Sequence, residues 1–216
     1  PAEDYWLPRE TLKPVKLPIP DKSSTRGEFK GQMLLIINED WRGYKSGDLL
    51  SFSFDDFMQT GEIDSLNLIY SPNERSSLGN IGATQSKLLI SLFENVSGKA
   101  FAFDWDGQEW TSEALDFLAA GSIHIGATDD KEEEAFIITD GFLTPSTTWL
   151  YNTATKEKRQ AKSLPAWFDA SSMVVEQFEA ASSDGTLVPY FVVRAKNCEL
   201  NGKNPTLLYG YGGFEV

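Results

Sequence analysis

The residues best suited to chemistry lie at the C-terminal end of the chain, in the segment Leu-Tyr-Gly-Tyr-Gly-Gly-Phe at residues 208–214. An apolar run opens there into closely spaced glycines, which let a backbone approach a substrate because they carry no Cβ. Acyl transfer needs hydrogen-bond donors aimed at the oxyanion that forms in the transition state. Tyr211, Gly212 and Gly213 are candidates for that task, and a glycine-rich strand exit without chemistry would have the same composition.

The other chemistry-bearing residues do not complete a catalytic set. His124 is the single histidine and lies between two isoleucines in a strand-like run, where a structural hydrogen bond is the commoner role. No Gly-x-Ser-x-Gly nucleophile motif occurs. Glu215 stands where the last glycine of a dinucleotide-binding Gly-x-Gly-x-x-Gly would belong. These residues therefore contain no complete catalytic apparatus.

Acidic residues gather in three places, Asp55–Asp56, Asp104–Asp106 and Asp129–Glu134, without the fuller ligand pattern of a calcium site. Such charge runs are typical of solvated turns, and we interpret all three as turns. Cys198 is the single cysteine, which excludes an internal disulfide and a cysteine-based zinc site. We expect no metal and no cofactor.

The charge and the apolar content of the sequence disfavour two classes of partner, nucleic acids and membranes. The 216 residues carry 19 basic and 32 acidic side chains, a formal net charge of −13. Because nucleic-acid binding relies on Lys and Arg displacing counterions from phosphates, we expect no nucleic-acid partner. No apolar run reaches the roughly 20 residues that cross a bilayer, so we expect no membrane partner. The sequence leaves open whether the protein is cytoplasmic or periplasmic.

Short apolar runs separated by turn-forming residues predict a succession of β-strands. Helical periodicity is weak, and residues 113–120 could form at most a short helix. The strand-like runs are residues 33–37, 49–54, 66–70, 88–93, 100–103, 122–125, 135–138 and 148–151. We therefore predict a mainly all-β protein.

Two internal repeats suggest how these strands are organised. Ile81-Gly-Ala-Thr84 followed by Lys87 recurs as Ile125-Gly-Ala-Thr128 followed by Lys131, and residues 46–54 are echoed by residues 97–105. Repeats spaced by roughly 40–50 residues, each with several short strands, are typical of propeller blades. Chance similarity within a β-sandwich is the alternative.

The amino-acid pattern changes near residue 168. Asp184-Gly185 separates two β-rich runs and predicts a hairpin, because glycine accepts the positive φ of such a turn. Residues 205–214 form a third apolar run, as expected of a strand covered on both faces. We predict that the chain passes here from a β-only domain into the first strands of an α/β domain. In α/β-hydrolases the loop after the third strand supplies an oxyanion donor, which is the position of Tyr211.

Residues 174–216 resemble the start of the peptidase domain in the prolyl oligopeptidase family of serine peptidases. The matching features are Ser-Asp-Gly-Thr at 183–186, Val-Pro-Tyr-Phe at 188–191 and above all Leu-Tyr-Gly-Tyr-Gly-Gly-Phe. Residues 142–152 and 164–171 resemble the last propeller blade and the crossing to the peptidase domain in bacterial members. The related oligopeptidase B branch typically reads Tyr-Gly-Ser-Tyr-Gly here, so Gly212-Gly213-Phe214 favours the prolyl oligopeptidase branch.

The resemblance implies a longer parent protein, in which a seven-bladed propeller caps an α/β-hydrolase domain and filters substrates by size. That enzyme would cleave short peptides, commonly after proline. Residues 1–168 would form three to four blades, and residues 169–216 the first hydrolase strands. Tyr211 would stabilise the oxyanion through its hydroxyl, and Phe214, with Gly212 and Gly213, would line the pocket for the residue before the scissile bond. The family's serine, aspartate and histidine would lie beyond Val216, so we expect the chain alone to be inactive.

Two alternatives remain open at this point. A stand-alone propeller could serve as an interaction module whose acidic surface favours basic ligands. A related peptidase, such as an oligopeptidase B, could also contain these residues. Because fewer blades than a closed ring leave strand edges open, and open edges recruit other strands, we expect self-association.

Overall fold

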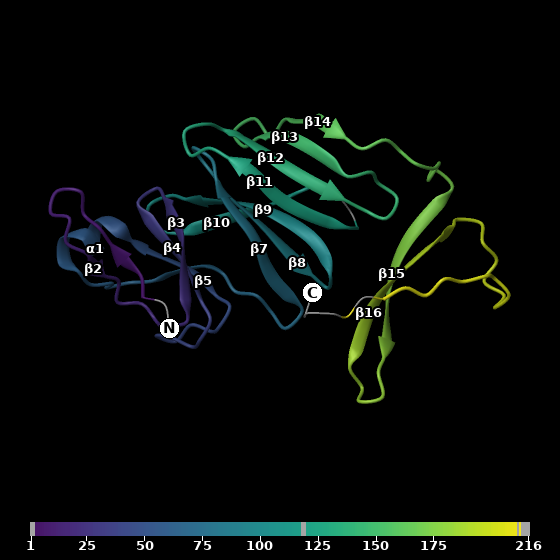
Figure 1. Cartoon of the computed structure of the whole chain (residues 1–216), viewed down its shortest axis with the longest axis horizontal. Coiled ribbons are helices and arrows are strands. Elements are labelled where there is room, and N and C mark those ends of the chain that lie inside the picture. Colours follow the sequence, from purple (N-terminus) through teal and green to yellow (C-terminus); the bar gives the residue numbers. More distant parts are fainter. Residues whose placement is uncertain (1–2, 118–119, 211, 213–216) are drawn as a thin grey trace. The chain divides into compact units, whose positions relative to one another are not determined.

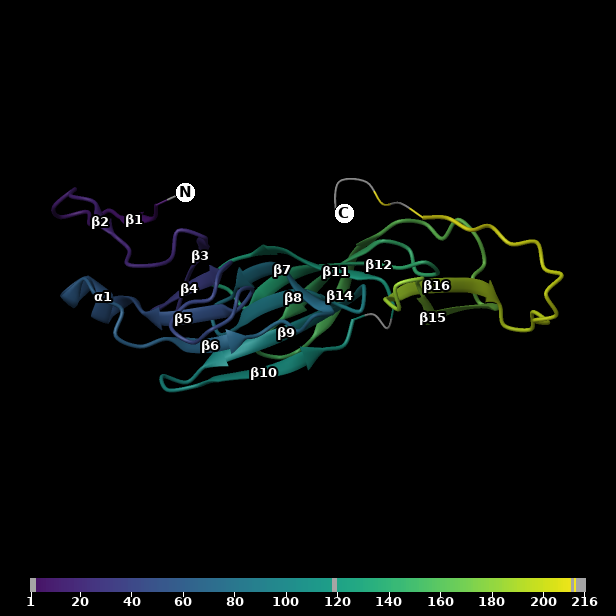
Figure 2. The same cartoon turned by 90° about the horizontal axis from the view of Figure 1, so that it is seen from below.

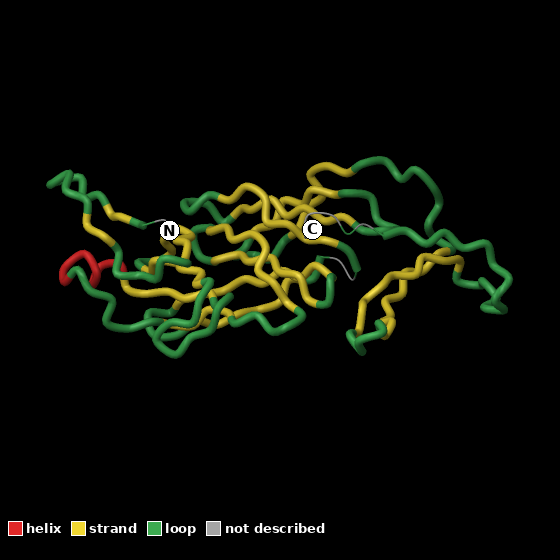
Figure 3. The backbone as a smooth tube through the Cα atoms, turned by 60° about the horizontal axis from the view of Figure 1, so that its bottom comes forward, coloured by secondary structure: helices red, strands yellow, loops and turns green. Residues whose placement is uncertain are grey.

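The computed structural model describes residues 3–117, 120–210 and 212 of the chain. Strands make up most of its regular structure, which confirms the mainly β character predicted from the sequence (Figure 3). The chain divides into two compact units, Pro1–Ala166 and Trp167–Val216. In the described residues, no helix is long and apolar enough to span a lipid bilayer.

The first unit contains three four-stranded antiparallel sheets, and in each the strands are arranged in chain order (Figure 1). Sheet I consists of β3 (Ser23–Phe29), β4 (Gln32–Ile37), β5 (Leu49–Ser53) and β6 (Asn67–Tyr70). Sheet II consists of β7 (Ser76–Ala83), β8 (Leu88–Glu94), β9 (Ser97–Trp105) and β10 (Trp110–Leu115). Sheet III consists of β11 (Ser122–Thr128), β12 (Glu134–Asp140), β13 (Thr147–Asn152) and β14 (Lys158–Ser163). A small ladder of β1 (Tyr5–Trp6) and β2 (Val15–Lys16) precedes them.

The sequence repeats fall at equivalent places in these sheets. Ile81–Thr84 covers the end of β7, and Ile125–Thr128 covers the end of β11, each the first strand of its sheet. The second pair of repeats, residues 46–54 and 97–105, covers β5 and β9, each a third strand. The repeats therefore mark successive copies of one four-stranded unit, which is consistent with propeller blades.

Sheet II packs against both of the other sheets (Figure 2). Successive side chains of a strand point to opposite faces, so a strand covered on both sides needs apolar residues throughout. The first three residues of strand β8 meet this requirement, because Leu88 and Ile90 pack toward sheet I while Leu89 packs toward sheet III, all three fully buried. Burial of each such side chain stabilises the fold by about 1.5–3 kcal/mol.

Two apolar cores result from this layering. The first holds Phe29, Leu34, Ile36, Leu49 and Ile69 of sheet I against Leu88, Ile90 and Phe103 of sheet II. The second holds Leu89, Ala100 and Ala102 of sheet II against Ile123, Ile125, Ala135, Ile137 and Tyr151 of sheet III. The small alanines of β9 leave room for the larger side chains of β11, which contacts β9 directly.

The other face of sheet I is covered by an N-terminal segment and by α1 (Phe54–Thr60). Leu17 and Phe57 pack there against Phe52. This helix was not predicted from the sequence. Ser53 caps it by accepting a hydrogen bond from the Asp56 amide, and acidic residues in its first turn complement the helix dipole.

The short helix allowed at residues 113–120 is wrong where the structure describes that segment. Glu113 and Leu115 lie in β10, opposite Ala102 and Ala100 of β9. Pairing with β9 and burial of Trp110 against Phe29 and Trp105 favour the extended conformation over a weak helical tendency. Strands β3, β7 and β14 were also not predicted, because none of them is a continuous apolar run.

The second unit contains a long hairpin of β15 (Met173–Ala181) and β16 (Leu187–Ala195). The predicted turn is confirmed: Gly185 has a φ of 86°, and the Asp184 carboxylate accepts a hydrogen bond from the Thr186 amide. The predicted third strand is wrong for residues 205–210, which form no strand in the described part of the chain. A strand needs a hydrogen-bonded neighbour, and neither described strand of this unit pairs with residues 205–210.

Gly98 of β9 lies close to the backbone at the start of sheet III. Its amide donates a hydrogen bond to the Gly121 carbonyl at 2.7 Å. A Cβ at position 98 would lie 2.4 Å from the Ile123 amide nitrogen. Backbone atoms cannot move away as a flexible side chain can, so a larger residue at this position would push the sheets apart.

We predict that Gly98→Ala lowers the free energy of unfolding by roughly 2–3 kcal/mol, because it overpacks a backbone contact. Urea unfolding followed by tryptophan fluorescence measures the change. Gly210→Ala is the matched control, since a Cβ at Gly210 meets no atom within 4 Å. Equal midpoints for the two variants would contradict this description of the sheet contact.

Candidate functional site

The structure does not test the site predicted at the C-terminal end. Tyr211, Gly213 and Phe214 lie outside the described residues. Gly212 is described, is exposed, and a Cβ there would meet no atom within 4 Å. The oxyanion and pocket roles of these four residues therefore remain predictions.

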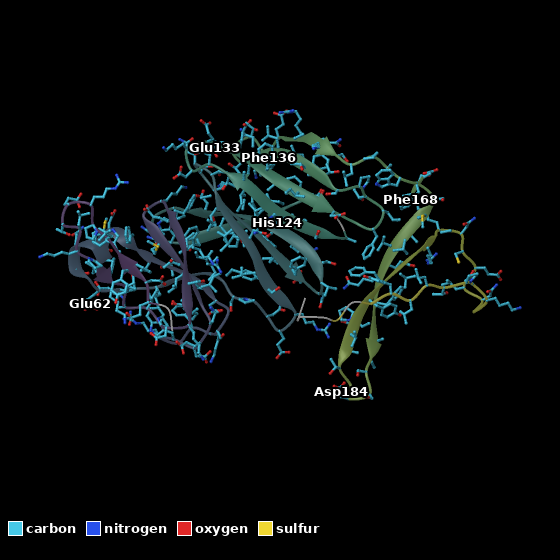
Figure 4. All side chains as sticks on the ribbon, in the orientation of Figure 1. Glu62, His124, Glu133, Phe136, Phe168 and Asp184 are labelled. Atoms are coloured by element: carbon cyan, nitrogen blue, oxygen red, sulfur yellow. The ribbon has the colours of Figure 1, made fainter. Side chains whose placement is uncertain are left out.

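His124 lies on β11, opposite Ile138 of β12, and is exposed (Figure 4). Its side chain makes no hydrogen bond or ion pair with other described residues. The structural hydrogen bond expected for this histidine is therefore wrong within the described part of the chain. Over the same residues, no group of three His, Cys, Asp or Glu side chains could hold a metal ion.

Polar side chains concentrate instead at the turns that join first to second strands and at the ends of third strands. The turn clasp, as we call this set, consists of Lys30, Thr84, Ser86, Lys87, Asp104, Glu133 and Thr153. It connects all three sheets at one end. Because these residues belong to turns and strand ends, the regular packing of the sheets below brings them together.

Asp104 forms the half of the turn clasp between sheets I and II. Its carboxylate accepts a hydrogen bond from Lys30 Nζ of sheet I at 2.6 Å and another from Lys87 Nζ of sheet II at 2.8 Å. Partial burial raises the pKa of Asp104, but the two lysines outweigh this effect and hold the pKa below that of an ordinary aspartate. The charged form is thus stabilised in the folded state.

Glu133 forms the half between sheets II and III, at the turn that precedes β12 (Figure 4). Ser86 Oγ and Thr153 Oγ1 both donate to its Oε2 atom, at 2.7 and 2.5 Å. Thr153 Oγ1 also lies 3.0 Å from Thr84 Oγ1 of sheet II, and both threonines are buried. Burial raises the pKa of Glu133, and the hydroxyl donors lower it by more, so that the pKa lies below the usual value.

The geometry of the turn clasp favours a structural role over catalysis. A serine nucleophile needs an adjacent base that can take its proton, and the group beside Ser86 is the Glu133 carboxylate. A carboxylate whose pKa is lowered is a weaker base, and no described histidine adjoins it. The clasp therefore joins sheets through hydrogen bonds to ionised carboxylates.

The acidic runs can now be assigned individually. Asp106 accepts hydrogen bonds from the Gln108 and Glu109 amides, and Asp129 from the Lys131 amide, so the turn interpretation is confirmed for both. The interpretation is wrong for Asp55–Asp56, which lie in the first turn of α1, and for Asp104, which lies in β9. It is incomplete for Glu133. The repeated Thr-x-x-Lys pattern was the signal that could have revealed the clasp, because Thr84 and Lys87 both belong to it.

Comparisons with known proteins extend over nearly the whole chain. No family profile matches it. The chain is 33% identical over 208 residues to an uncharacterised peptidase of Sinorhizobium fredii, covering 94% of the chain and 28% of that protein. It is 31% identical over 213 residues to an uncharacterised peptidase of Rickettsia prowazekii, covering 96% of the chain and 29% of that protein. The chain thus spans less than a third of the length of these relatives.

Solved structures of peptidases are similar in fold to nearly the whole chain. A post-proline cleaving enzyme from Rickettsia typhi matches 99% of the chain with a TM-score of 0.78 and 29% identity, over 32% of that enzyme. Oligopeptidase B from Trypanosoma brucei matches 97% of the chain and 31% of its own with a TM-score of 0.74, at 14% identity. Prolyl oligopeptidase B from Galerina marginata, solved with a 35-residue substrate, matches 92% of the chain and 24% of its own with a TM-score of 0.61, at 18% identity. The last two matches show shared fold alone.

We predict that Asp104→Asn destabilises the chain at pH 7 by about 0.5–1 kcal/mol, a modest effect because surface ion pairs are partly screened by solvent. The pKa of Asp104 is lowered on folding, so its contribution is complete above the unfolded-state pKa and is lost as the pH falls through the folded-state pKa. The difference in urea midpoint from the unmodified chain should therefore shrink between pH 7 and pH 3.

Asp64→Asn is the matched control for this measurement. Asp64 is exposed, its side chain forms no hydrogen bond or ion pair with other described residues, and its replacement removes the same formal charge. If both variants lose equal stability at pH 7, the effect comes from net charge rather than from the turn clasp.

Proposed function

From the premise that this chain is a relative of the prolyl oligopeptidase family, we propose that it is part of a serine-type oligopeptidase. Its first unit would contribute blades of the propeller, and its second unit the first strands of the α/β-hydrolase domain. The observation that carries the proposal is the alignment with two peptidases, each more than 30% identical over at least 94% of the chain. An alignment of that length includes both units.

The second unit supports the hydrolase assignment through its unfinished sheet. Its two strands pair only with each other in the described residues, and apolar side chains such as Val188, Tyr190 and Val193 are exposed along β16. Exposed apolar residues on a hairpin are typical of strands that pack within a larger sheet. We propose that further strands and helices of a hydrolase domain cover them.

We propose that Tyr211 donates a hydrogen bond from its hydroxyl to the oxyanion, and that Phe214, Gly212 and Gly213 line the pocket for the residue before the scissile bond. Short peptides would be the substrates, and the propeller blades would restrict entry by size. The family's peptide chemistry supports this choice, since the Galerina marginata enzyme has been solved with a peptide substrate. The chain alone would be inactive, because its serine nucleophile would lie outside these residues.

Two other assignments are less well supported. A stand-alone interaction module would not account for the alignment with peptidases through the second unit. An oligopeptidase B shares the fold, but the Tyr-Gly-Tyr-Gly-Gly-Phe segment at residues 209–214 departs from the Tyr-Gly-Ser-Tyr-Gly typical of that branch.

We also propose self-association of the isolated chain through open strand edges. Edge strand β14 carries Lys158, Arg159 and Lys162, and charged edges disfavour pairing. The β15–β16 hairpin lacks that protection over much of its length and is the more favourable edge. A mass above that of the 24.1 kDa monomer in light scattering supports this proposal, and a clean monomer contradicts it.

We predict that Tyr211→Phe, in the full-length protein that contains this chain, lowers kcat/KM for a blocked proline peptide by roughly 10²–10³-fold, mostly through kcat. The reason is that the hydroxyl would act in the transition state and not in substrate binding. Tyr209→Phe is the control, because Tyr209 is exposed and has no assigned role. A fluorophosphonate probe should label the full-length protein and leave the 216-residue chain unlabelled.

An unchanged kcat/KM for Tyr211→Phe would remove the proposed oxyanion role. Labelling of the isolated chain by the probe would contradict the placement of the nucleophile outside it.

A further inference from the structure

A cleft of the first unit lies at the end of the sheets opposite the turn clasp. It has a volume of about 540 Å³ and is formed by β3, by the loop between β4 and β5 and by the connection from β6 to β7. Ile36, Pro72 and Leu78 give it an apolar floor. Arg26, Asn38 and Ser77 add polar groups that can form hydrogen bonds.

A β-bulge positions the Arg26 side chain at this cleft. Strand β3 pairs with β4 at Thr25 and again at Glu28, and the register shifts between them. Arg26 and Gly27 therefore lie opposite Leu34 alone, and Gly27 has a φ of 89°. Bulges re-aim side chains and are over-represented next to functional sites.

Two further clefts contain lysines, one lined in part by Lys30 and the other by Lys87 and Lys156. Arg26 differs from these lysines because it forms no ion pair with other described residues. Lys30 and Lys87 bind Asp104, and Lys156 binds Glu113, so those clefts are internally neutralised. Among the described residues, the Arg26 guanidinium forms no ion pair, and its side chain is exposed. Glu74 lines the same cleft without pairing with it. The guanidinium is available to an external anion.

The surroundings select the class of anion. A guanidinium binds a carboxylate through two parallel hydrogen bonds, and the amide and hydroxyl of Asn38 and Ser77 suit peptide groups. The apolar floor suits an apolar side chain next to the carboxylate. A polyanion would meet repulsion from Glu74 and from a chain of net charge −13, whereas a singly charged ligand meets much less.

We propose that this cleft binds the free C-terminal carboxylate of a short peptide through Arg26. The choice of a peptide as the ligand rests on the proposed function, while the carboxylate and its partner follow from the cleft itself. Such a site would favour small peptides, or the C-terminal products of cleavage, over internal segments of folded proteins.

The test compares an acetylated tetrapeptide ending in leucine, as the free acid and as the C-terminal amide, in calorimetric titrations of the unmodified 216-residue chain. We expect the acid to bind at least tenfold more tightly than the amide. Arg26→Gln should abolish this preference, and Arg26→Lys should retain part of it, because a lysine keeps the charge and loses the bidentate geometry. Arg159→Gln, on the exposed edge strand β14, removes the same charge elsewhere and should leave the preference intact.

Equal binding of acid and amide would overturn the proposal, and so would an equal loss in Arg26→Gln and Arg159→Gln. Displacement of the peptide by inorganic phosphate as effectively as by acetate would also overturn it, since the cleft would then bind anions without selecting a carboxylate. These titrations need no catalysis. Failure here therefore leaves the Tyr211 experiment unaffected, and failure of that experiment leaves this proposal standing.

Discussion

The burial of sheet II on both faces is the constraint on which the first unit depends. Strand β8 places Leu88 and Ile90 in one core and Leu89 in the other, so a single strand supports both sheet contacts. Such alternation leaves no face for charged residues at the first three positions of β8. The charged and hydroxyl side chains of the turn clasp lie instead at turns and strand ends.

The two carboxylates of the turn clasp have a structural role at the strand ends. Asp104 and Glu133 each join two sheets through hydrogen bonds that stabilise the charged carboxylate. At the opposite end of the sheets, Arg26 faces a cleft without a carboxylate partner. Sheet I thus contributes the ion-paired Lys30 at one end and, at the other, Arg26, which forms no ion pair with other described residues.

Sequence reasoning succeeded where burial imposes a continuous apolar pattern. The runs at 88–93 and 135–138 predicted β8 and β12, and Asp184-Gly185 predicted the hairpin, because these signals are local. Strand β14, which is charged, gives no such signal, and β10 adopts its conformation through pairing with β9. The clasp role of Glu133 depends on Ser86, 47 positions earlier, so its local sequence could not indicate it. Tyr211, the main site prediction, lies outside the described residues.

Amide hydrogen exchange of the unmodified chain tests most directly whether sheet II holds the first unit together. Amides of β8 should exchange only through global unfolding of that unit, with a protection free energy equal to the unfolding free energy from urea. Amides of the edge strand β14 should exchange faster, through local opening. The account would be contradicted if β8 exchanged as fast as β14, because the strand buried on both faces would then open without loss of the fold.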